Sequence, residues 1–181
     1  MTRIPYNQKV YVDRRWKHFN KILKDNGIDY FLVFGTCLGI IREGGYIEKD
    51  DDLDLGMLYN EEKIKKLIDI LSKNGYEIRR ILYCENNDIK KKYGEKSIRN
   101  IHFFIDNILF DMFILYKIEN HYILADNWII KTDLEKLITV EYVGMKLNVP
   151  KDYEKFLEEI YKDWKIPTGG GAWDKGWKYD G

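Results

Sequence analysis

Apolar and polar residues alternate most regularly in the segment DLDLGML, residues 52–58. A period of two residues is typical of a strand that buries one face. Leu53 and Leu55 then enter the core, while Asp52 and Asp54 project from the opposite face. The pattern therefore predicts two carboxylates side by side on a rigid strand.

Other segments repeat their apolar residues every three or four positions, which is typical of amphipathic helices. The predicted helices cover residues 9–26, 60–74 and 150–161, and Asn60 is a good capping residue for the second. A shorter helix, through residues 37–42, is predicted after the apolar strand 30–34.

The remaining apolar runs are short and bounded by turn residues, which predicts further strands. These strands cover residues 76–83, 98–105, 109–116, 122–128 and 138–149. Asp106-Asn107 is a plausible tight turn. The polar stretch 86–96 is predicted to be a solvated loop, with a basic lip for an anionic acceptor as the alternative. With these helices and strands, we expect an α+β fold.

Composition limits the classes of function. The 181 residues are expected to form one domain over residues 1–165, followed by a Gly/Trp-rich tail over residues 166–181. Thirty basic and thirty acidic residues give a formal net charge of zero, so no global field would attract nucleic acid. The two cysteines form no disulfide framework. With no run long enough to span a bilayer, we expect a cytoplasmic protein with at most peripheral membrane contact.

Four carboxylates crowd into five positions at Asp50, Asp51, Asp52 and Asp54. They repel one another by about 1 kcal/mol per pair in water and by more where solvent is scarce. Hard oxygen ligands of this kind suit Mg²⁺ or Mn²⁺, which complete their coordination shells with water and substrate phosphates.

Two alternatives compete with this magnesium site. An acidic run can be a solvated loop, although such loops do not alternate with leucine. Asp50, Asp52, Asp54 and Glu61 also match positions of an EF-hand calcium loop, but Leu55 occupies the position that requires glycine.

Gly35-Thr36 follows the strand 30–34 and opens the short helix. Free backbone N–H groups at such a turn can bind phosphate, and Thr36 could cap the helix or bind the ligand. Arg42 lies near the end of that helix, where its planar fork could hold phosphate oxygens. An ordinary strand-to-helix turn remains the alternative.

Asp111 interrupts the apolar run ILFDMFILY. A bare carboxylate there is costly unless it is paired or bound to metal, so a structural ion pair with an arginine is one explanation. His102, on the preceding strand, could face the same cleft, and its use as a general base has no support from spacing.

The segment GTCLGIIREGGYIEKDDDLDLGM resembles the central motif of the LicD family, which includes bacterial phosphocholine transferases and fukutin-type polyol-phosphate transferases. The segment VPKDYEKFLEEIYKDWKIP resembles the end of that family's domain. Glu48-Lys49 stand where the family usually has Pro-Trp. The resemblance implies a nucleotidyltransferase-like mixed sheet flanked by helices, and a third metal carboxylate at Asp111.

The resemblance also implies a metal-dependent enzyme that moves phosphocholine or a polyol phosphate from a CDP-linked donor to a hydroxyl of a glycan or polyol acceptor. Asp52, Asp54 and Asp111 would hold Mg²⁺ or Mn²⁺, and Asp51 or Asp50 would accept the acceptor's proton. Gly35, Thr36 and Arg42 would position the donor phosphates, and Asp50 would also bind substrate. Two alternatives stay open: transfer of a nucleotide from an NTP, and a non-catalytic calcium-binding module.

Overall fold

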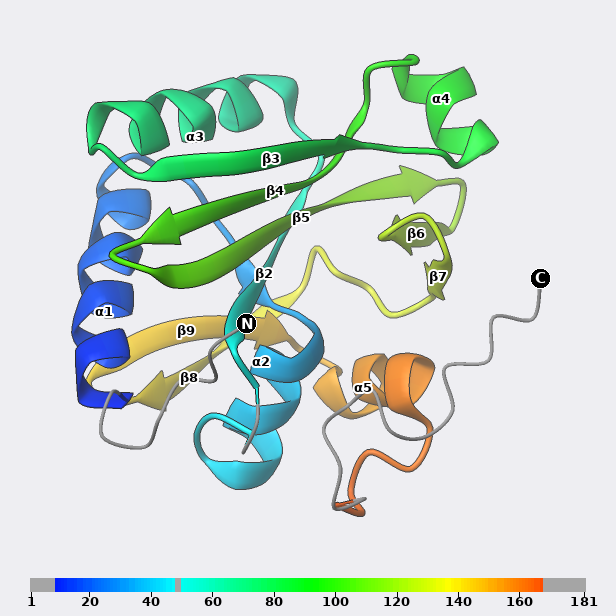
Figure 1. The fold of residues 1–181 in the computed structure, drawn as a ribbon. Coiled ribbons are helices and arrows are strands. Elements are labelled where there is room, and N and C mark those ends of the chain that lie inside the picture. Colours follow the sequence, from blue (N-terminus) through cyan, green and yellow to red (C-terminus); the bar gives the residue numbers. More distant parts are fainter. Residues whose placement is uncertain (1–8, 48–49, 168–181) are drawn as a thin grey trace.

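The computed structural model describes residues 9–47 and 50–167. Its helices are α1 (Lys9–Asp25), α2 (Phe34–Leu38), the π-helix η2 (Gly39–Glu43), α3 (Glu61–Lys73), α4 (Asn87–Tyr93) and α5 (Tyr153–Tyr161). Its strands are β1 (Phe31–Leu32), β2 (Asp52–Leu58), β3 (Glu77–Tyr83), β4 (Ile98–Ile105), β5 (Ile108–Ile118), β6 (His121–Leu124), β7 (Trp128–Ile130), β8 (Leu137–Tyr142) and β9 (Met145–Pro150). Figure 1 shows these elements along the chain.

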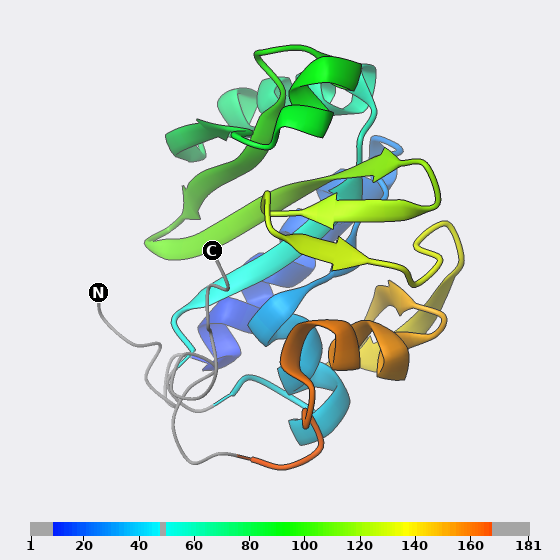
Figure 2. The same cartoon turned by 90° about the vertical axis from the view of Figure 1, so that its right-hand side faces the viewer.

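A mixed sheet forms the centre of the molecule, with its strands in the order β1-β2-β5-β4-β3. β2 and β5 are parallel neighbours, and the other pairs along this path are antiparallel. β6 and β7 extend the sheet from the end of β5, while β8 and β9 form a separate hairpin. The predicted α+β architecture, a mixed sheet flanked by helices, is confirmed (Figures 1 and 2).

One face of the sheet is buried against α1. The ring of Phe19 lies 5.4 Å from that of Phe103 and 5.5 Å from that of Phe110, measured between centroids. Leu53 and Leu55 are fully buried, as the alternation in β2 predicts. Burying side chains of this size stabilises the fold by about 1.5–3 kcal/mol each, so this face fixes the register of the strands.

The strand predicted over residues 30–34 is longer than the observed strand β1, mainly at its C-terminal end. β1 covers only Phe31–Leu32, and Phe34 already begins α2 with a φ of 42°. A positive φ turns the chain sharply, which ends the pairing with β2. Val33 is the capping residue and makes no side-chain bond, so the prediction that Thr36 caps this helix is wrong.

The predicted loop 86–96 instead contains α4. The Asn86 side chain accepts hydrogen bonds from the N–H groups of Asp88 and Ile89, which caps the helix. Ile89 is 1% exposed and anchors α4 to the core. A short helix with one buried residue leaves almost no periodicity in a sequence, which explains why the helix was missed.

Two further boundaries differ from the prediction. The segment 122–128 is not one strand, because Ala125 and Asp126 have φ values of 49° and 68° and turn the chain between β6 and β7. Pro150 ends β9 and does not open the last helix, which begins at Tyr153. The segment 138–149 forms two paired strands, β8 and β9, which turn at Val143-Gly144, and the predicted tight turn at Asp106-Asn107 is confirmed.

α2 and α5 lie side by side at one end of the sheet in both views (Figures 1 and 2). The greater part of the predicted tail, from residue 168 on, lies outside the described residues.

Candidate active site

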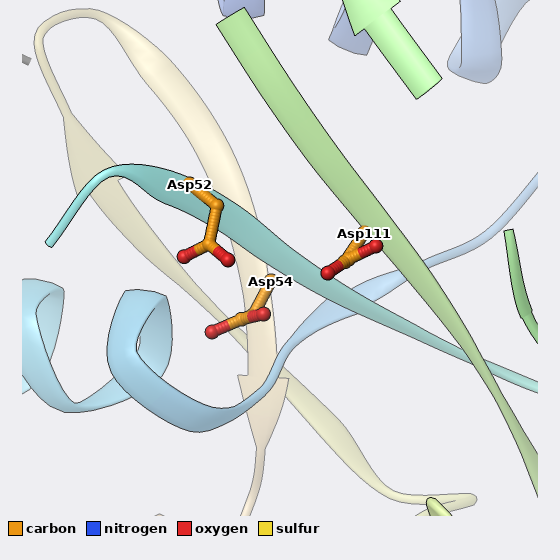
Figure 3. A group of neighbouring side chains, drawn as sticks. All are labelled: Asp52, Asp54 and Asp111. Carbon is orange, nitrogen blue, oxygen red and sulfur yellow. The ribbon is translucent and has the colours of Figure 1, made fainter. Parts of the chain in front are cut away.

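Asp52, Asp54 and Asp111 converge on one place. Each offers one carboxylate oxygen, and these oxygens all lie within 4.8 Å of one another. Asp52 and Asp54 come from β2, and Asp111 comes from β5, where it is the register partner of Asp54. Figure 3 shows the three carboxylates projecting from the two strands toward a common region beside α2.

The site is electrostatically strained without a cation. Burial raises the pKa of Asp52 to about 8, with further contributions from Asp50, Asp111 and Asp51. The pKa of Asp54 is raised well above its usual value, first by burial and then by Asp52 and Asp50. Within residues 9–47 and 50–167, no lysine or arginine forms an ion pair with any of these carboxylates.

Asp50 completes the acidic cluster from the chain just before β2. The pKa of Asp50 is raised to about 6, mainly by burial; a hydrogen bond with Asp52 lowers it and the charge of Asp51 raises it. Its carboxylate lies so close to Gly35 that a Cβ at position 35 would collide with it. A glycine is therefore needed at this turn so that Asp50 can approach.

The Gly35-Thr36 turn holds Asp54. The N–H group of Gly35 donates to Asp54 Oδ2 at 3.2 Å, and the N–H group of Asp54 donates to Thr36 Oγ1 at 2.7 Å. Thr36 is only 3% exposed. These bonds attach the turn to β2 at the residue that pairs with Asp111, so Gly35 and Thr36 fix the position of a carboxylate in the site.

Arg42 bonds to residues outside the acidic triad. Its Nη1 donates to the backbone oxygen of Trp164 at 2.9 Å, and its Nε donates to Glu43 at 2.6 Å. The guanidinium thus connects η2 to the chain that follows α5. Two of its five N–H donors are occupied by these bonds.

Two further residues lie at the site: Tyr161, which the sequence did not indicate, and His102, which was expected to face the cleft but had no supported role. Tyr161 of α5 lies near Asp54 and Asp50: burial and then the Asp54 charge raise the pKa of its phenol well above its usual value. His102 Nδ1 is in contact with Asp111 Oδ1. Counting outward from the predicted turn at Asp106-Asn107 pairs His102 with Asp111, so this contact could have been predicted from the sequence. Tyr161 gives no such signal, because it occupies an ordinary apolar position of an amphipathic helix.

The donor set fits a divalent hard cation. Three carboxylates supply oxygen ligands and negative charge, which is what Mg²⁺ and Mn²⁺ prefer, so this acidic triad could hold a metal ion. An EF-hand loop is excluded, because residues 52–58 form a strand and residues 61–73 form a helix. Among residues 9–47 and 50–167, Asp111 forms no ion pair with an arginine, and its contact is with His102.

Comparison with known proteins supports the resemblance noted from sequence. Residues 27–152 match the family model described as LicD/FKTN/FKRP, nucleotidyltransferase domain. The site thus lies in a domain of the nucleotidyltransferase class. The chain belongs to the LicD family.

Two curated relatives show the extent of the match. An uncharacterized protein of Rickettsia typhi, RT0683, is 23% identical over 169 residues, covering 90% of this chain and 49% of its own. The ribitol-5-phosphate transferase FKTN of Mus musculus is 28% identical over 171 residues, covering 87% of this chain and 33% of its own. The chain therefore spans between one third and one half of the length of these relatives.

A solved structure supports the nucleotidyltransferase-like fold. The lincosamide antibiotic adenylyltransferase LnuA, bound to lincomycin, aligns with a TM-score of 0.52 at 11% identity, over 80% of this chain and 83% of its own. This likeness concerns the fold. In the part of the chain that the structure describes, none of the helices combines the length and apolar character needed to cross a bilayer.

Proposed function

We propose that the protein is a metal-dependent transferase that moves a substituted phosphate, such as phosphocholine or a polyol phosphate, from a CDP-linked donor to a hydroxyl group of a glycan or polyol acceptor. Membership of the LicD family and similarity to a protein named a ribitol-5-phosphate transferase support this class of reaction. The donor, the metal and the acceptor are parts of the proposal.

The observation that carries the proposal is the convergence of Asp52, Asp54 and Asp111. Buried carboxylates this close together are unfavourable unless they are protonated or neutralised. Mg²⁺ or Mn²⁺ would be held by these three residues, and when bound it supplies positive charge for the donor's phosphates.

The chain's own residues would position the reactants. Gly35 and Thr36 act through Asp54, whose carboxylate and backbone N–H they hold. Arg42 keeps its remaining N–H donors for a donor phosphate while it anchors the segment at Trp164. Asp51 or Asp50, next to the triad, would take the proton from the acceptor hydroxyl. Positioning and electrostatic stabilisation together account for most of the catalysis in phosphoryl transfer.

A reaction with labelled donors tests the proposal. The protein would be incubated with Mg²⁺ and CDP-choline, CDP-ribitol, CTP or ATP, each labelled in both the nucleotide and the transferred group. We expect the head-group phosphate to reach the acceptor while CMP is released. Transfer of the nucleotide itself, with release of pyrophosphate, would instead establish the nucleotidyltransferase alternative.

A matched pair of variants makes this test specific. Asp52→Asn should abolish transfer, because it removes a ligand while preserving shape. Asp69→Asn is the control, since Asp69 lies on α3 and pairs with Lys73 at 2.6 Å on the surface. Metal held tightly without any nucleotide, and no transfer in the wild type, would support a calcium-binding module.

We also propose a cytoplasmic location. Cys37 and Cys84 are both free and buried, which suits a reducing compartment. Mass spectrometry of thiols alkylated in intact cells would test this, with both cysteines expected in the reduced state.

A further inference from the structure

A line of polar side chains leads away from the triad along β4. Asn100 and His102 are two residues apart, so both project from the same face of the strand. His102 is the register partner of Asp111. Asn100 is 2% exposed and Asp111 is 5% exposed, so their polar atoms need partners inside the protein.

The contacts in this line are consecutive. Arg99 Nε donates to Asn100 Oδ1 at 3.2 Å. Asn100 Nδ2 lies 2.9 Å from His102 Nε2, and His102 Nδ1 is in contact with Asp111 Oδ1. Among the described residues, that buried oxygen of Asp111 makes no regular hydrogen bond, and its one polar contact is the ion-pair contact with His102.

The far end of the line is fixed as well. Arg99 Nη1 lies 3.4 Å from Asp126 Oδ2. The Asp126 carboxylate also accepts hydrogen bonds from the N–H groups of Glu85 and Asn86, at 3.1 Å and 3.4 Å. The guanidinium is therefore held in place by a side chain that is only 7% exposed.

These contacts have only one consistent direction. A guanidinium can donate but not accept, so Arg99 must face the oxygen of the Asn100 amide. The amide nitrogen then faces His102 Nε2, which has to be the acceptor. A neutral imidazole that accepts at Nε2 carries its proton at Nδ1. That proton points to Asp111 and makes the contact between Nδ1 and the carboxylate attractive.

We propose that Arg99, Asn100 and His102 form a directional relay that holds the proton on His102 Nδ1 and orients Asp111. His102 binds one oxygen of Asp111, which leaves the other directed at the site shared with Asp52 and Asp54. His102 is thus a positioning residue and not the general base. The proposal rests on the proposed metal role of Asp111, and it names the residues that control that ligand.

The first test is spectroscopic and needs no metal. Long-range ¹H–¹⁵N correlation of the imidazoles in the metal-free wild-type protein would be assigned through the loss of signals in His102→Ala. We expect the Nδ1–H tautomer for His102. Asn100→Asp places an acceptor against Nε2 and should move the proton to Nε2. Finding the Nε2–H tautomer in the wild type would overturn the relay.

The second test is the affinity for Mn²⁺, measured by calorimetry on the intact chain. Residues that orient metal ligands typically contribute about 10–100-fold to metal affinity, so His102→Ala and Asn100→Leu should each weaken Mn²⁺ binding by about 10-fold or more. His121→Ala is the control, because His121 lies on β6 away from this line. Unchanged affinity in both His102→Ala and Asn100→Leu would contradict the positioning role.

The two tests distinguish a failure of the proposed relay from a failure of the proposed metal-dependent function. If the wild type bound no Mn²⁺ even with CDP present, the proposed function would fail, and the positioning of a metal ligand would fail with it. An Nε2–H tautomer together with normal Mn²⁺ binding would overturn the relay alone. Asn100→Leu also covers the case in which His102→Ala does not fold, since it leaves the imidazole in place.

Discussion

Asp54 and Asp111 are register partners across the parallel strands β2 and β5, and they bring two buried carboxylates into one site. At this separation two ionised carboxylates repel each other strongly unless a counter-ion neutralises them. Leu53 and Leu55 hold β2 in this register from the opposite face. The repulsion is therefore built into the sheet, and it has consequences that can be measured.

Removing one carboxyl group from the cluster should stabilise the metal-free protein. Asp52→Asn keeps the shape of the side chain and relieves the repulsion with Asp54 and Asp111. We expect a rise in the melting temperature without metal, where 1 kcal/mol corresponds to about 2–4 °C for a chain of this size. Saturating Mg²⁺ should reverse the order, because only the wild type gains binding energy. A lower melting temperature for the metal-free variant would contradict the prediction.

The stability of the metal-free protein should fall as the pH rises. The pKa of Asp52 is raised to about 8 in the fold, against 3.8 for the free side chain, so the folded state binds more protons than the unfolded state between these values. Its contribution is fully present below about pH 4 and is lost as the pH passes about 8. Urea denaturation at pH 5 and at pH 8 would measure this.

Two controls belong to the pH experiment. The difference in unfolding free energy between the two pH values should shrink in Asp52→Asn, because the titrating group is gone. It should also shrink when Mg²⁺ is present at pH 8. Equal pH dependence in wild type and variant would mean that other groups dominate.

Gly35→Ala should destabilise the protein and disturb the site. The added Cβ would collide with the Asp50 carboxylate, and forced overpacking costs about 1–3 kcal/mol. Gly45→Ala is the matched control, because a Cβ there meets only Tyr142 atoms at 3.8 Å, an ordinary contact. Chemical denaturation of both variants would compare them, and an equal loss of stability would contradict the crowding at position 35.

Thr36→Val should weaken the connection between α2 and β2. It leaves the Asp54 N–H without the acceptor that it now has at 2.7 Å. An unsatisfied buried donor costs about 1–3 kcal/mol. Thr36→Ser restores the oxygen and should recover most of the lost stability and metal affinity. A Val variant as stable as the Ser variant would show that this bond contributes nothing.

The sequence predicted correctly those elements whose residue pattern depends only on neighbouring residues. The alternation in β2 follows directly from one buried face, and Asn60 caps α3 as predicted, with its side chain accepting from the N–H group of Lys63. The pairing of Asp54 with Asp111 is not local, because it depends on which strands become neighbours. The family resemblance placed Asp111 at the metal site on a neighbouring strand, but it did not give this register.

Other parts of the site had no readable signal. The turn at Phe34 has a φ of 42°, which a phenylalanine in the sequence does not predict. Tyr161 lies near the acidic cluster because α5 packs against α2. The direction of Arg42 toward Trp164 likewise depends on a contact between distant segments. These features are set by tertiary packing, so local patterns could not predict them.

The most direct test of the central claim is a crystal structure with Mn²⁺ and CDP, measured at the manganese absorption edge. Our account predicts an anomalous peak bound by Asp52, Asp54 and Asp111 together, and no such peak in crystals of Asp54→Asn grown in the same way. Manganese bound elsewhere, or a triad that stays free of metal while CDP is bound, would contradict it.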